Sequence, residues 1–469
     1  MKTSLILFSV LFFQLVYCQY TWDKVDCGTE YSLALRSDHT LWSWGNNLNG
    51  QLGIGSTSTQ TTPIQIGTSS DWKSIAVGAF HVLAIKMDGT LWSWGYNVVG
   101  QLGNGNTIQQ NAPIQIGNET NWKEVSAGMA SSLALKNDST IWSWGYNSLG
   151  QLGLGNTIDQ SSPTQIGTLH EWISISTGGA HSLLIKSDST LWAFGYNGSS
   201  QLGDNSTATS LIPIQIGNDS DWTHVSAGFE FSLGRKSNGT IWSWGFNGNG
   251  QLGNGSTLTG GIPAQIGTAQ NWKRIEAGSG FAFAINNNNE LFGWGYNSQG
   301  QLGNGSTVQQ LTCTQIGIEN NWKDISAACG AVNGGTVYGS HSLALKMNAN
   351  SICATGSNYI SQLGNDLGNQ SVEFSCVTGD LTVGIITNSI TNFVIFPNPS
   401  SGKFSVQLND FNEGNVAKIT LLNSAGQIIF TKFENNLIST LDLSQLEKGI
   451  YFIEVCIENH ISTERIIIE

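Results

Sequence analysis

Basic residues are scarce in this sequence. Only 19 of the 469 residues are lysine or arginine, against 32 aspartates and glutamates, which gives a formal net charge of −13 at pH 7. A chain this acidic repels a phosphate backbone, so nucleic acid is a poor candidate partner. Charged residues of either sign make up 11% of the chain, whereas glycine numbers 57. Low charge with many Gly, Asn, Ser and Thr residues predicts short strands joined by many turns.

Long apolar runs are equally scarce. None beyond the N-terminus is long enough to cross a bilayer, so we expect no transmembrane span. The first residues, MKTSLILFSVLFFQLVYCQY, place Lys2 before a nearly unbroken apolar run over residues 5–16, which is typical of a signal peptide. We therefore predict that residues 1–18 are removed on export. Lipid attachment at Cys18 is a weaker alternative, since the bulky Tyr17 precedes it.

Zinc-type cysteine spacing is absent, since the chain contains no CxxC pair. Six cysteines follow the predicted cleavage site: Cys27, Cys313, Cys329, Cys353, Cys376 and Cys456. Export permits disulfide bonds. Four of the six lie between residues 313 and 376, so one or two bridges in that segment are one expectation. Free buried thiols that pack as small apolar groups are an equally supported alternative.

Recognised catalytic and cofactor motifs are absent as well. The sequence contains no GxSxG, HExxH or Walker motif. The glycine-rich GNGST at Gly253–Thr257 has counterparts in most units of the chain, and we expect no helix after it, so we do not interpret it as a phosphate-binding loop. The Asp/Asn-rich turns do not match the spacing of a calcium loop. We therefore name no catalytic residue and expect no metal and no cofactor.

The main feature that the sequence does contain is a repeat. Tryptophan recurs every 50 residues, at positions 22, 72, 122, 172, 222, 272 and 322. The tripeptide QLG begins at Gln51, Gln101, Gln151, Gln201, Gln251, Gln301 and Gln362. The last of these intervals is longer than 50, and most of the excess lies in the insertion Cys329–His341. Seven units therefore extend from Trp22 to about Gly379, which indicates a repeat architecture.

Each unit has the pattern of four strands. In the second unit, WKSIAVG (Trp72–Gly78) alternates apolar and polar residues, HVLAIKM (His81–Met87) follows a short turn, and LWSWG (Leu91–Gly95) follows a hairpin turn. A polar loop then leads to a fourth strand, PIQIG (Pro113–Gly117). Seven four-stranded units predict an all-β, seven-bladed β-propeller. A linear solenoid is the alternative, but it would need atypical end units, and the first unit resembles the inner ones.

The repeated phrases resemble one family of propellers. WD repeats are usually shorter than 50 residues, and the Gly-Gly pair of kelch units is missing from most units here. WGxNxxGQLG, with AGxxHSLALK upstream, is instead similar to the RCC1 repeat over residues 22 to about 379. The resemblance implies that residues 19–379 form a seven-bladed RCC1-like propeller. Members of that family serve nucleotide exchange, ubiquitin ligation and inhibition of secreted enzymes. The last unit, ICATGSNYISQLG from Ile352, departs from the pattern, so the way in which the ring closes stays open.

A different pattern begins after Gly379. Residues 380–392 are a predicted linker, and alternating strands separated by SG, AGQ and KG turns then predict a small β-sandwich over residues 393–469. The segments PNPSSG, NSAGQ and LEKGIYFIEV together resemble the C-terminal sorting domain of the bacterial type IX secretion system. That resemblance implies contact of residues 393–469 with the secretion machinery, a bacterial origin, and release or attachment at the cell surface.

Three histidines share one repeat position. His81, His181 and His341 stand where the other units carry Tyr31, Ser131, Phe231 and Phe281. A catalytic or metal-binding role would require several of them to converge, whereas a seven-fold ring keeps equivalent atoms apart. We therefore interpret them as packed or hydrogen-bonded groups. The repeated tryptophans and GQLG segments are likewise interpreted as packing elements, since seven copies of a catalytic motif would be redundant.

The turn after the first strand of each unit varies more than the rest. Phe80, Met129 and Phe229 place large apolar residues on this turn, and Glu30 and Glu230 place acids there. Because every unit places its turn alike, these five residues would gather on one face of the ring and form a ligand-binding face. The alternative is that they pack against neighbouring units.

The predicted function is recognition of an unknown extracellular protein or glycan by one propeller face of a secreted or cell-surface protein. Nucleotide exchange on a nuclear GTPase fits neither export nor the acidic composition, and the fold alone does not fix function. The main alternative is a secreted lyase or hydrolase with a polar site at the axial channel, for which Glu30, Glu230 and the three histidines are the candidates. A structural or adhesive component is a third hypothesis.

Overall fold

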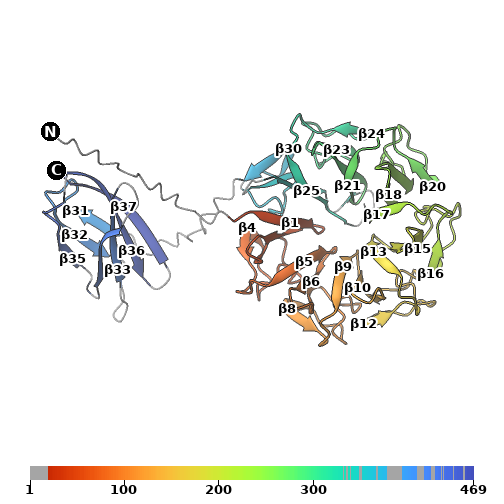
Figure 1. The fold of residues 1–469 in the computed structure, drawn as a ribbon, viewed down its shortest axis with the longest axis horizontal. Helices are drawn as coiled ribbons and strands as arrows, with labels where there is room; N and C mark the ends of the chain where they lie inside the picture. The colour runs from red at the N-terminus through yellow and green to blue at the C-terminus, as the bar shows by residue number, and fades with distance from the viewer. Residues whose placement is uncertain are drawn as a thin grey trace, which may run out of the picture. The chain divides into compact units, whose positions relative to one another are not determined.

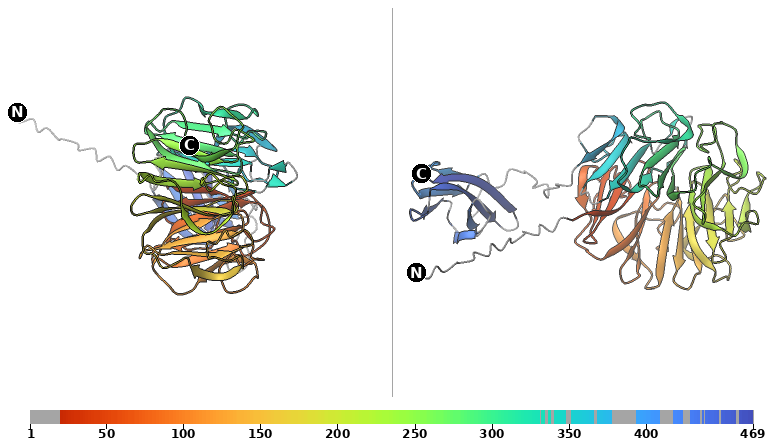
Figure 2. Two further views of the ribbon diagram at one scale, coloured as in Figure 1. Left: turned by 90° about the vertical axis from the view of Figure 1, so that its right-hand side faces the viewer. Right: turned by 45° about the horizontal axis from the view of Figure 1, so that its top comes forward.

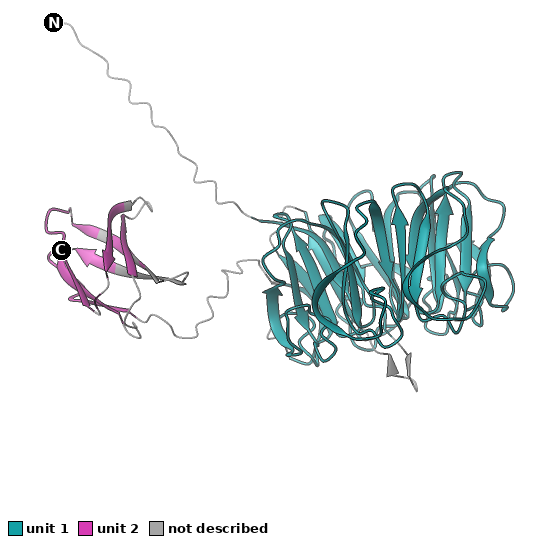
Figure 3. Ribbon diagram, turned by 90° about the horizontal axis from the view of Figure 1, so that it is seen from below, with its two compact units in different colours: residues 1–379 teal, residues 380–469 magenta. Residues whose placement is uncertain are grey.

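The structure of this chain is a computed structural model with two compact units, which divide between Gly379 and Asp380 (Figure 3). The residues that it describes are 20–330, 332–333, 336–337, 340–347, 351–365, 368–377, 393–408, 417–423, 428–434, 436, 438–446, 448–457 and 460–468. The predicted signal peptide, residues 1–18, and the predicted linker, residues 380–392, lie outside the described residues.

Unit 1 is built from seven four-stranded antiparallel sheets that surround a common axis as the blades of a propeller (Figure 1). Blade 1 consists of β1 (Trp22–Cys27), β2 (Tyr31–Arg36), β3 (Leu41–Gly45) and β4 (Gln60–Gln65), and blade 2 consists of β5 (Trp72–Val77), β6 (His81–Lys86), β7 (Leu91–Gly95) and β8 (Gln110–Ile116). Blade 3 consists of β9 (Trp122–Ala127), β10 (Ser131–Lys136), β11 (Ile141–Gly145) and β12 (Gln160–Gln165), and blade 4 consists of β13 (Trp172–Thr177), β14 (His181–Lys186), β15 (Leu191–Gly195) and β16 (Ser210–Gln215). Blade 5 consists of β17 (Trp222–Ala227), β18 (Phe231–Lys236), β19 (Ile241–Gly245) and β20 (Gly260–Gln265), and blade 6 consists of β21 (Trp272–Ala277), β22 (Phe281–Asn286), β23 (Leu291–Gly295) and β24 (Gln310–Gln315). Blade 7 consists of β25 (Trp322–Ala327), β28 (His341–Lys346), β29 (Ile352–Ser357) and β30 (Gln370–Val377). The predicted fold class is confirmed.

The core of the propeller lies between neighbouring blades. The second strand of each blade is flanked by the first and third, and in blade 2 all six residues of β6 are buried. Leu33 and Leu35 of blade 1 pack in one cluster with Trp72 and Ile75 of blade 2, and the junctions between successive blades from 2 to 7 repeat this arrangement. Each blade therefore buries apolar area against the next, at roughly 25 cal/mol per Å² removed from water.

Blades 1 and 7 each have their own four strands, and the ring is closed by hydrogen bonds between them that involve side chains. The indole N–H of Trp44 in blade 1 donates to the carbonyl oxygen of Gln362 in blade 7 at 2.9 Å. Between inner blades, Trp94 donates to the carbonyl oxygen of Gln51 in the same way at 3.0 Å. The backbone N–H of Cys27 also donates to Ser326 Oγ of β25 at 3.1 Å. The seventh blade therefore contacts the first as the inner blades contact one another, which answers the question that the degenerate repeat left open.

Blade 7 replaces the repeated packing by two devices of its own. A disulfide joins Cys353 on β29 to Cys376 on β30, and these residues pair across the two strands. Thr355 donates from Oγ1 to the carbonyl oxygen of Gly300, in a place where blade 4 has Phe194 and the remaining blades have a tryptophan. One of the expected bridges is thus present, while among the described residues Cys27, Cys313 and Cys329 are free thiols. The side chain of Cys456 lies outside the described part of the chain.

Unit 2 is a β-sandwich of two sheets. One sheet has the order β31 (Phe393–Phe396), β32 (Lys403–Leu408), β35 (Ile438–Asp442), and the other has the order β34 (Ile428–Glu434), β33 (Ala417–Asn423), β36 (Gly449–Ile457), β37 (His460–Ile468). Phe404 and Val406 of the first sheet and Ile419 and Ile453 of the second form one core. In the described parts of both units, no helix is long and apolar enough to cross a bilayer.

Candidate functional site

One end of every blade carries the variable turns that the sequence singles out. The turn between the first and second strands lies beside the loop that follows the third strand, because Tyr31 pairs with Gly45 and the backbone N–H of Asn46 donates to the carbonyl oxygen of Glu30 at 2.9 Å. We call this end of the ring, formed by residues 28–30 and 46–50 and their equivalents, the turn face. The strands run between the turn face and the opposite face, as side views of the ring show (Figure 2).

The repeated WGxNxxGQLG segment holds the turn face together. In blade 3, Asn147 Oδ1 accepts the backbone N–H of Leu152 at 3.0 Å, and Gln151 Oε1 accepts that of Leu149 at 2.9 Å. The indole of Trp144 donates to the carbonyl oxygen of Gln101 in blade 2 at 2.9 Å. Gly145 has a φ of 101°, and a Cβ there would lie 2.5 Å from the carbonyl oxygen of Ala130. The prediction that this motif is a packing element fits these contacts.

A second repeated device, which sequence reasoning missed, lies at the opposite face. In blade 3 the ammonium of Lys136 lies 4.6 Å from the ring centroid of Trp122 and 3.7 Å from that of Trp142. Glu119 accepts a hydrogen bond from it at 2.8 Å. Lys136 is 3% exposed, so a buried cation is held between two indoles and one carboxylate. Equivalent lysines in other blades are Lys86, Lys186, Lys236 and Lys346.

The three repeat histidines join neighbouring blades and do not meet one another. His81 Nε2 lies 2.9 Å from Ser132 Oγ of the next blade, and that hydroxyl donates to the carbonyl oxygen of Gln101 at 2.7 Å. The serine proton is therefore already used, so His81 donates from Nε2. His181 and His341 make the same contact with Ser232 and Ser32. Burial lowers the pKa of all three histidines to about 3, which keeps them neutral packing groups.

Three of the five predicted site residues meet in one groove on the turn face. Met129 of blade 3 and Phe229 and Glu230 of blade 5 line a groove of about 400 Å³. The other residues that line it are Ala130, Tyr146, Leu149, Gln151, Gly179, Ala180 and Tyr196. Leu149 is 37% exposed, and the side chains of Met129, Phe229 and Glu230 are half-buried. The walls of the groove are thus apolar and aromatic, with one carboxylate.

The groove forms where the turn of blade 4 carries only small residues. Gly179 and Ala180 stand where blade 3 has Met129 and Ala130 and blade 5 has Phe229 and Glu230. A Cβ on Gly179 would lie 2.5 Å from the carbonyl oxygen of Phe229 and 2.7 Å from its ring. The small turn of blade 4 therefore forms the floor, while the larger turns on either side form the walls.

The two remaining predicted residues lie on the turn face but outside this groove. Phe80 of blade 2 packs edge to face against Tyr96, with ring centroids 6.3 Å apart. Glu30 of blade 1 accepts a hydrogen bond from Asn46 Nδ2 at 2.9 Å. The residue after the glycine that ends the third strand was not weighed in the sequence, and it is aromatic in five blades: Tyr96, Tyr146, Tyr196, Phe246 and Tyr296. A comparison of the variable residue in WGx across units would have found them.

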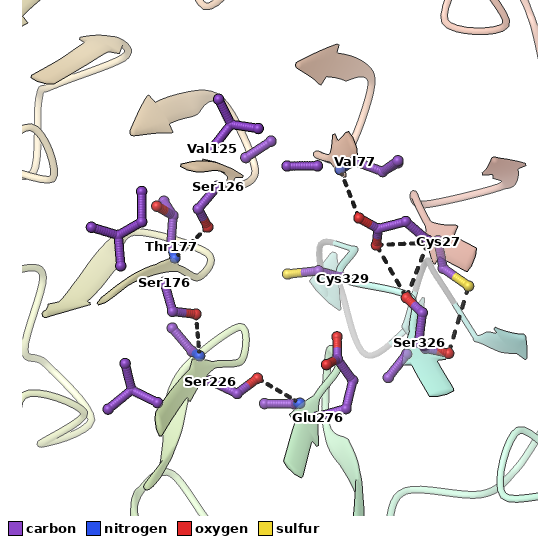
Figure 4. A pocket seen from close by; sticks show the side chains of 18 of the residues that line it. Cys27, Val77, Val125, Ser126, Ser176, Thr177, Ser226, Glu276, Ser326 and Cys329 are labelled. Carbon is purple, nitrogen blue, oxygen red and sulfur yellow. Dashed lines mark hydrogen bonds between the residues drawn. The ribbon is translucent and has the colours of Figure 1, made fainter. Parts of the chain in front are cut away.

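The first strands of the blades surround an axial channel of about 260 Å³ (Figure 4). Side chains at one repeat position link adjacent strands: Ser126, Ser176 and Ser226 accept the backbone N–H groups of Thr177, Ala227 and Ala277 at 2.9 Å. These bonds hold the inner strands in register around the axis.

Two blades place an acid at this repeat position. Asp26 accepts the N–H of Val77 and the hydroxyl of Ser326. Glu276 points into the channel (Figure 4), and its side chain is 23% exposed there. The surrounding protein raises the pKa of Glu276 to about 8 and also raises that of Asp26, mainly through lost hydration. Arg274 lies 3.6 Å from Glu276 but binds Asp324 more closely, at 2.7 Å.

The channel does not form a metal centre within the described residues, because no group of three or more His, Cys, Asp or Glu side chains there is placed to hold an ion. Asp26 and Glu276 were not predicted from the sequence, because the units were not compared at this position of the first strand. The sequence does mark these two residues as departures from the repeat, because they are acids at a position where most units have serine or alanine.

Family comparison agrees with this architecture. The model of the RCC1-like domain matches residues 14–267, and two models of the regulator of chromosome condensation (RCC1) repeat match residues 272–301 and 288–332. The chain belongs to the RCC1-like family.

Solved structures share the fold at low identity. Prp20p from Saccharomyces cerevisiae is 18% identical, with a TM-score of 0.65 over 78% of this chain and 90% of that one. Human WBSCR16 is 23% identical, with a TM-score of 0.60 over 66% of this chain and 85% of that one. Yeast RCC1 (Prp20) bound to Kap60 is 18% identical, with a TM-score of 0.63 over 76% of this chain and 86% of that one.

Unit 2 matches the secretion system C-terminal sorting domain over residues 394–469. The type IX sorting resemblance is therefore confirmed, and the chain is a secreted or cell-surface protein. The sorting domain accounts for interaction with the secretion machinery, and export agrees with the signal peptide that the sequence predicts.

Proposed function

We propose that the RCC1-like propeller is an extracellular binding module that recognises a protein or a glycan through its turn face. The observation that carries this proposal is the groove of about 400 Å³ between blades 3 and 5, with Met129 and Phe229 in its walls. Its volume lies within the range of about 300–1,000 Å³ that is usual for ligand pockets, and aromatic walls with few polar groups are typical of them. Repeated residues hold the ring, so unit-specific residues such as these are available for recognition.

The yeast relative is described by its binding to Gsp1p and histones. We do not transfer these partners, because at 18% identity the likeness concerns the fold, and this chain carries a sorting domain for export.

The proposal is tested by probing arrays of immobilised glycans and peptides with the full chain. Met129→Ala and Phe229→Ala should each weaken retention of the bound probes by roughly tenfold, as expected for apolar groups at the centre of an interface. The matched control is Ile158→Ala, which removes another exposed apolar side chain of blade 3, 66% exposed and outside the groove. Retention that is equal in all three variants would contradict the proposal.

A hydrolase or lyase at the axial channel is the second candidate function. The observation that favours it is Glu276, whose raised pKa of about 8 would keep its carboxyl protonated at neutral pH, as a general acid requires. Asp26 supplies a second carboxyl in the same channel. Turnover of a polysaccharide or peptide substrate that falls as pH rises through about 8, and is lost in Glu276→Gln, would support it. Glu30, which lies outside the channel, is the control position, as Glu30→Gln.

A further inference from the structure

Among the described residues, Glu230 is the one charged side chain that lines the groove on the turn face. Its carboxylate accepts a hydrogen bond from Ser199 Oγ at 3.2 Å, and among the described residues no lysine, arginine or histidine forms an ion pair with it. A half-buried carboxylate with a single neutral donor keeps acceptor capacity for a ligand that enters the groove.

The equivalent acid of blade 1 shows what Glu230 lacks. Glu30 occupies the same repeat position and accepts a hydrogen bond from the amide of Asn46 at 2.9 Å. In blade 5 the residue equivalent to Asn46 is Phe246, whose side chain has no donor. In blade 5 the hydroxyl of Ser199 takes the place of that amide, so the donor to Glu230 comes from blade 4 and over a longer distance, 3.2 Å.

The groove also contains the chemical groups with which this chain binds its own cations. At the opposite face, Lys136 lies between Trp122 and Trp142, and Glu119 caps its ammonium. The ammonium of Lys136 is thus bound by two aromatic rings and a carboxylate. The groove combines Tyr146, Tyr196 and Phe229 with Glu230, together with Met129 and Leu149, but contains no cation of its own.

These observations favour a ligand with an apolar stem and a positive end. An alkyl chain would pack against Met129 and Leu149, and its charge would lie near the aromatic rings and Glu230. A neutral glycan would leave the carboxylate without a counter-charge. The net charge of −13 also favours a cationic partner over an acidic one.

We infer that the groove binds a lysine or arginine side chain presented by an extracellular polypeptide. This inference rests on the proposed function, because it assigns the chemistry of the partner to the same groove. Met129, Leu149 and Phe229 contact the stem, and Glu230 pairs with the ammonium or guanidinium group.

The test uses the full chain and arrayed peptides that differ at one central residue: lysine, arginine, acetyl-lysine or norleucine. Lysine and arginine peptides should be retained about tenfold more strongly than the two uncharged ones, because the latter keep the stem and lose the charge. Glu230→Gln should abolish this preference. Glu30→Gln removes an acid at the same repeat position of blade 1 and should leave the preference unchanged. Melting curves of both variants establish that the propeller remains folded.

Two results would overturn the inference while leaving the binding function intact. One is equal retention of lysine and norleucine peptides with loss of both in Phe229→Ala. The other is binding of neutral glycans but not of peptides, again lost in Phe229→Ala. If no probe depends on Met129 or Phe229, both the inference and the proposed function fail. A preference for cationic peptides that survives Glu230→Gln would also overturn the inference, because the charge would then be recognised elsewhere.

Discussion

Lys136 illustrates at the scale of the residue how the scaffold uses polar groups. Its ammonium is removed from water and compensated by two indoles and Glu119. His81 is likewise buried, and a hydrogen bond from its imidazole links it to Ser132 of the next blade. Both residue types suggest chemistry when they are considered alone in a sequence, yet their recurrence across blades identifies them as structural. Glu230 differs because it lines the groove and accepts its hydrogen bond from Ser199, whereas its counterpart Glu30 lies outside the groove and is bound by Asn46.

Removal of one buried lysine tests the structural role of this device. Lys136→Met keeps the apolar stem but removes the charge between Trp122 and Trp142, and it leaves Glu119 without its partner. We expect a loss of roughly 1–2 kcal/mol in the free energy of unfolding, most of it from the cation–π contacts, since Glu119 is half exposed and the ion pair is screened. Urea denaturation measures it. Lys123→Met, at an exposed position of the same blade, should change the value little.

The buried histidines predict how stability depends on pH. Burial lowers the pKa of His181 from 6.5 to about 3 in the folded chain, so the unfolded chain binds more protons between these values. The melting temperature should therefore fall as pH falls from about 6.5 towards 3. His181→Phe, which introduces the residue found at this position in blade 5, should make that decline shallower. His170→Gln, at an exposed histidine, is the control, and an unaltered slope in His181→Phe would refute the explanation.

At the scale of the element, each blade is one four-stranded sheet, and departures from the common blade mark its special features. Blade 4 has a turn with little side chain, which opens the groove between its neighbours. Blade 7 lacks the packing tryptophan of its third strand and carries the Cys353–Cys376 disulfide between its two outer strands instead. Deviation from the repeat therefore accompanies the proposed ligand groove in one blade and a covalent link in another.

The disulfide predicts that the free energy of unfolding depends on oxidation of Cys353 and Cys376 in blade 7. Its sequence separation is 23 residues, and a cross-link that closes a loop of this size stabilises a fold by about 3 kcal/mol in the chain-entropy model. The double variant Cys353→Ala/Cys376→Ala should lower the free energy of unfolding by about that amount and should no longer respond to a reducing agent. Cys313→Ala, at a free thiol, should keep the response. Thiol labelling of Cys353 in the untreated chain would contradict the bridge.

At the scale of the whole molecule, the 50-residue period was enough to predict the seven blades, because each period contains four strands that cannot bury their faces alone. Contacts between distant residues were not predictable. Ring closure depends on Trp44 meeting the carbonyl of Gln362, and the lysine sites depend on strands that place Lys136 between two indoles. A lysine at a strand end looks solvated in a sequence, so its burial could not be recognised.

The candidate site was predictable in part. Met129, Phe229 and Glu230 were found as exceptions to the repeat, and the structure brings them into one groove. Phe80 and Glu30 met the same criterion but lie against Tyr96 and Asn46 in other blades. What separates the two groups is the small turn of blade 4, whose effect depends on the distance between neighbouring blades and not on the pattern within one unit.

The central claim is that repeated residues hold the ring while unit-specific residues of the turn face bind a partner. It is tested most directly by measuring melting temperature and ligand affinity together for two variants of blade 5. Trp244→Phe, which removes an indole bond to Gln201 and imitates Phe194 of blade 4, should lower the melting temperature and leave affinity unchanged. Phe229→Ala should lower affinity for peptides or glycans with little change in melting temperature. If Phe229→Ala instead destabilises the chain and leaves affinity unchanged, the turn face is part of the scaffold and the claim is wrong.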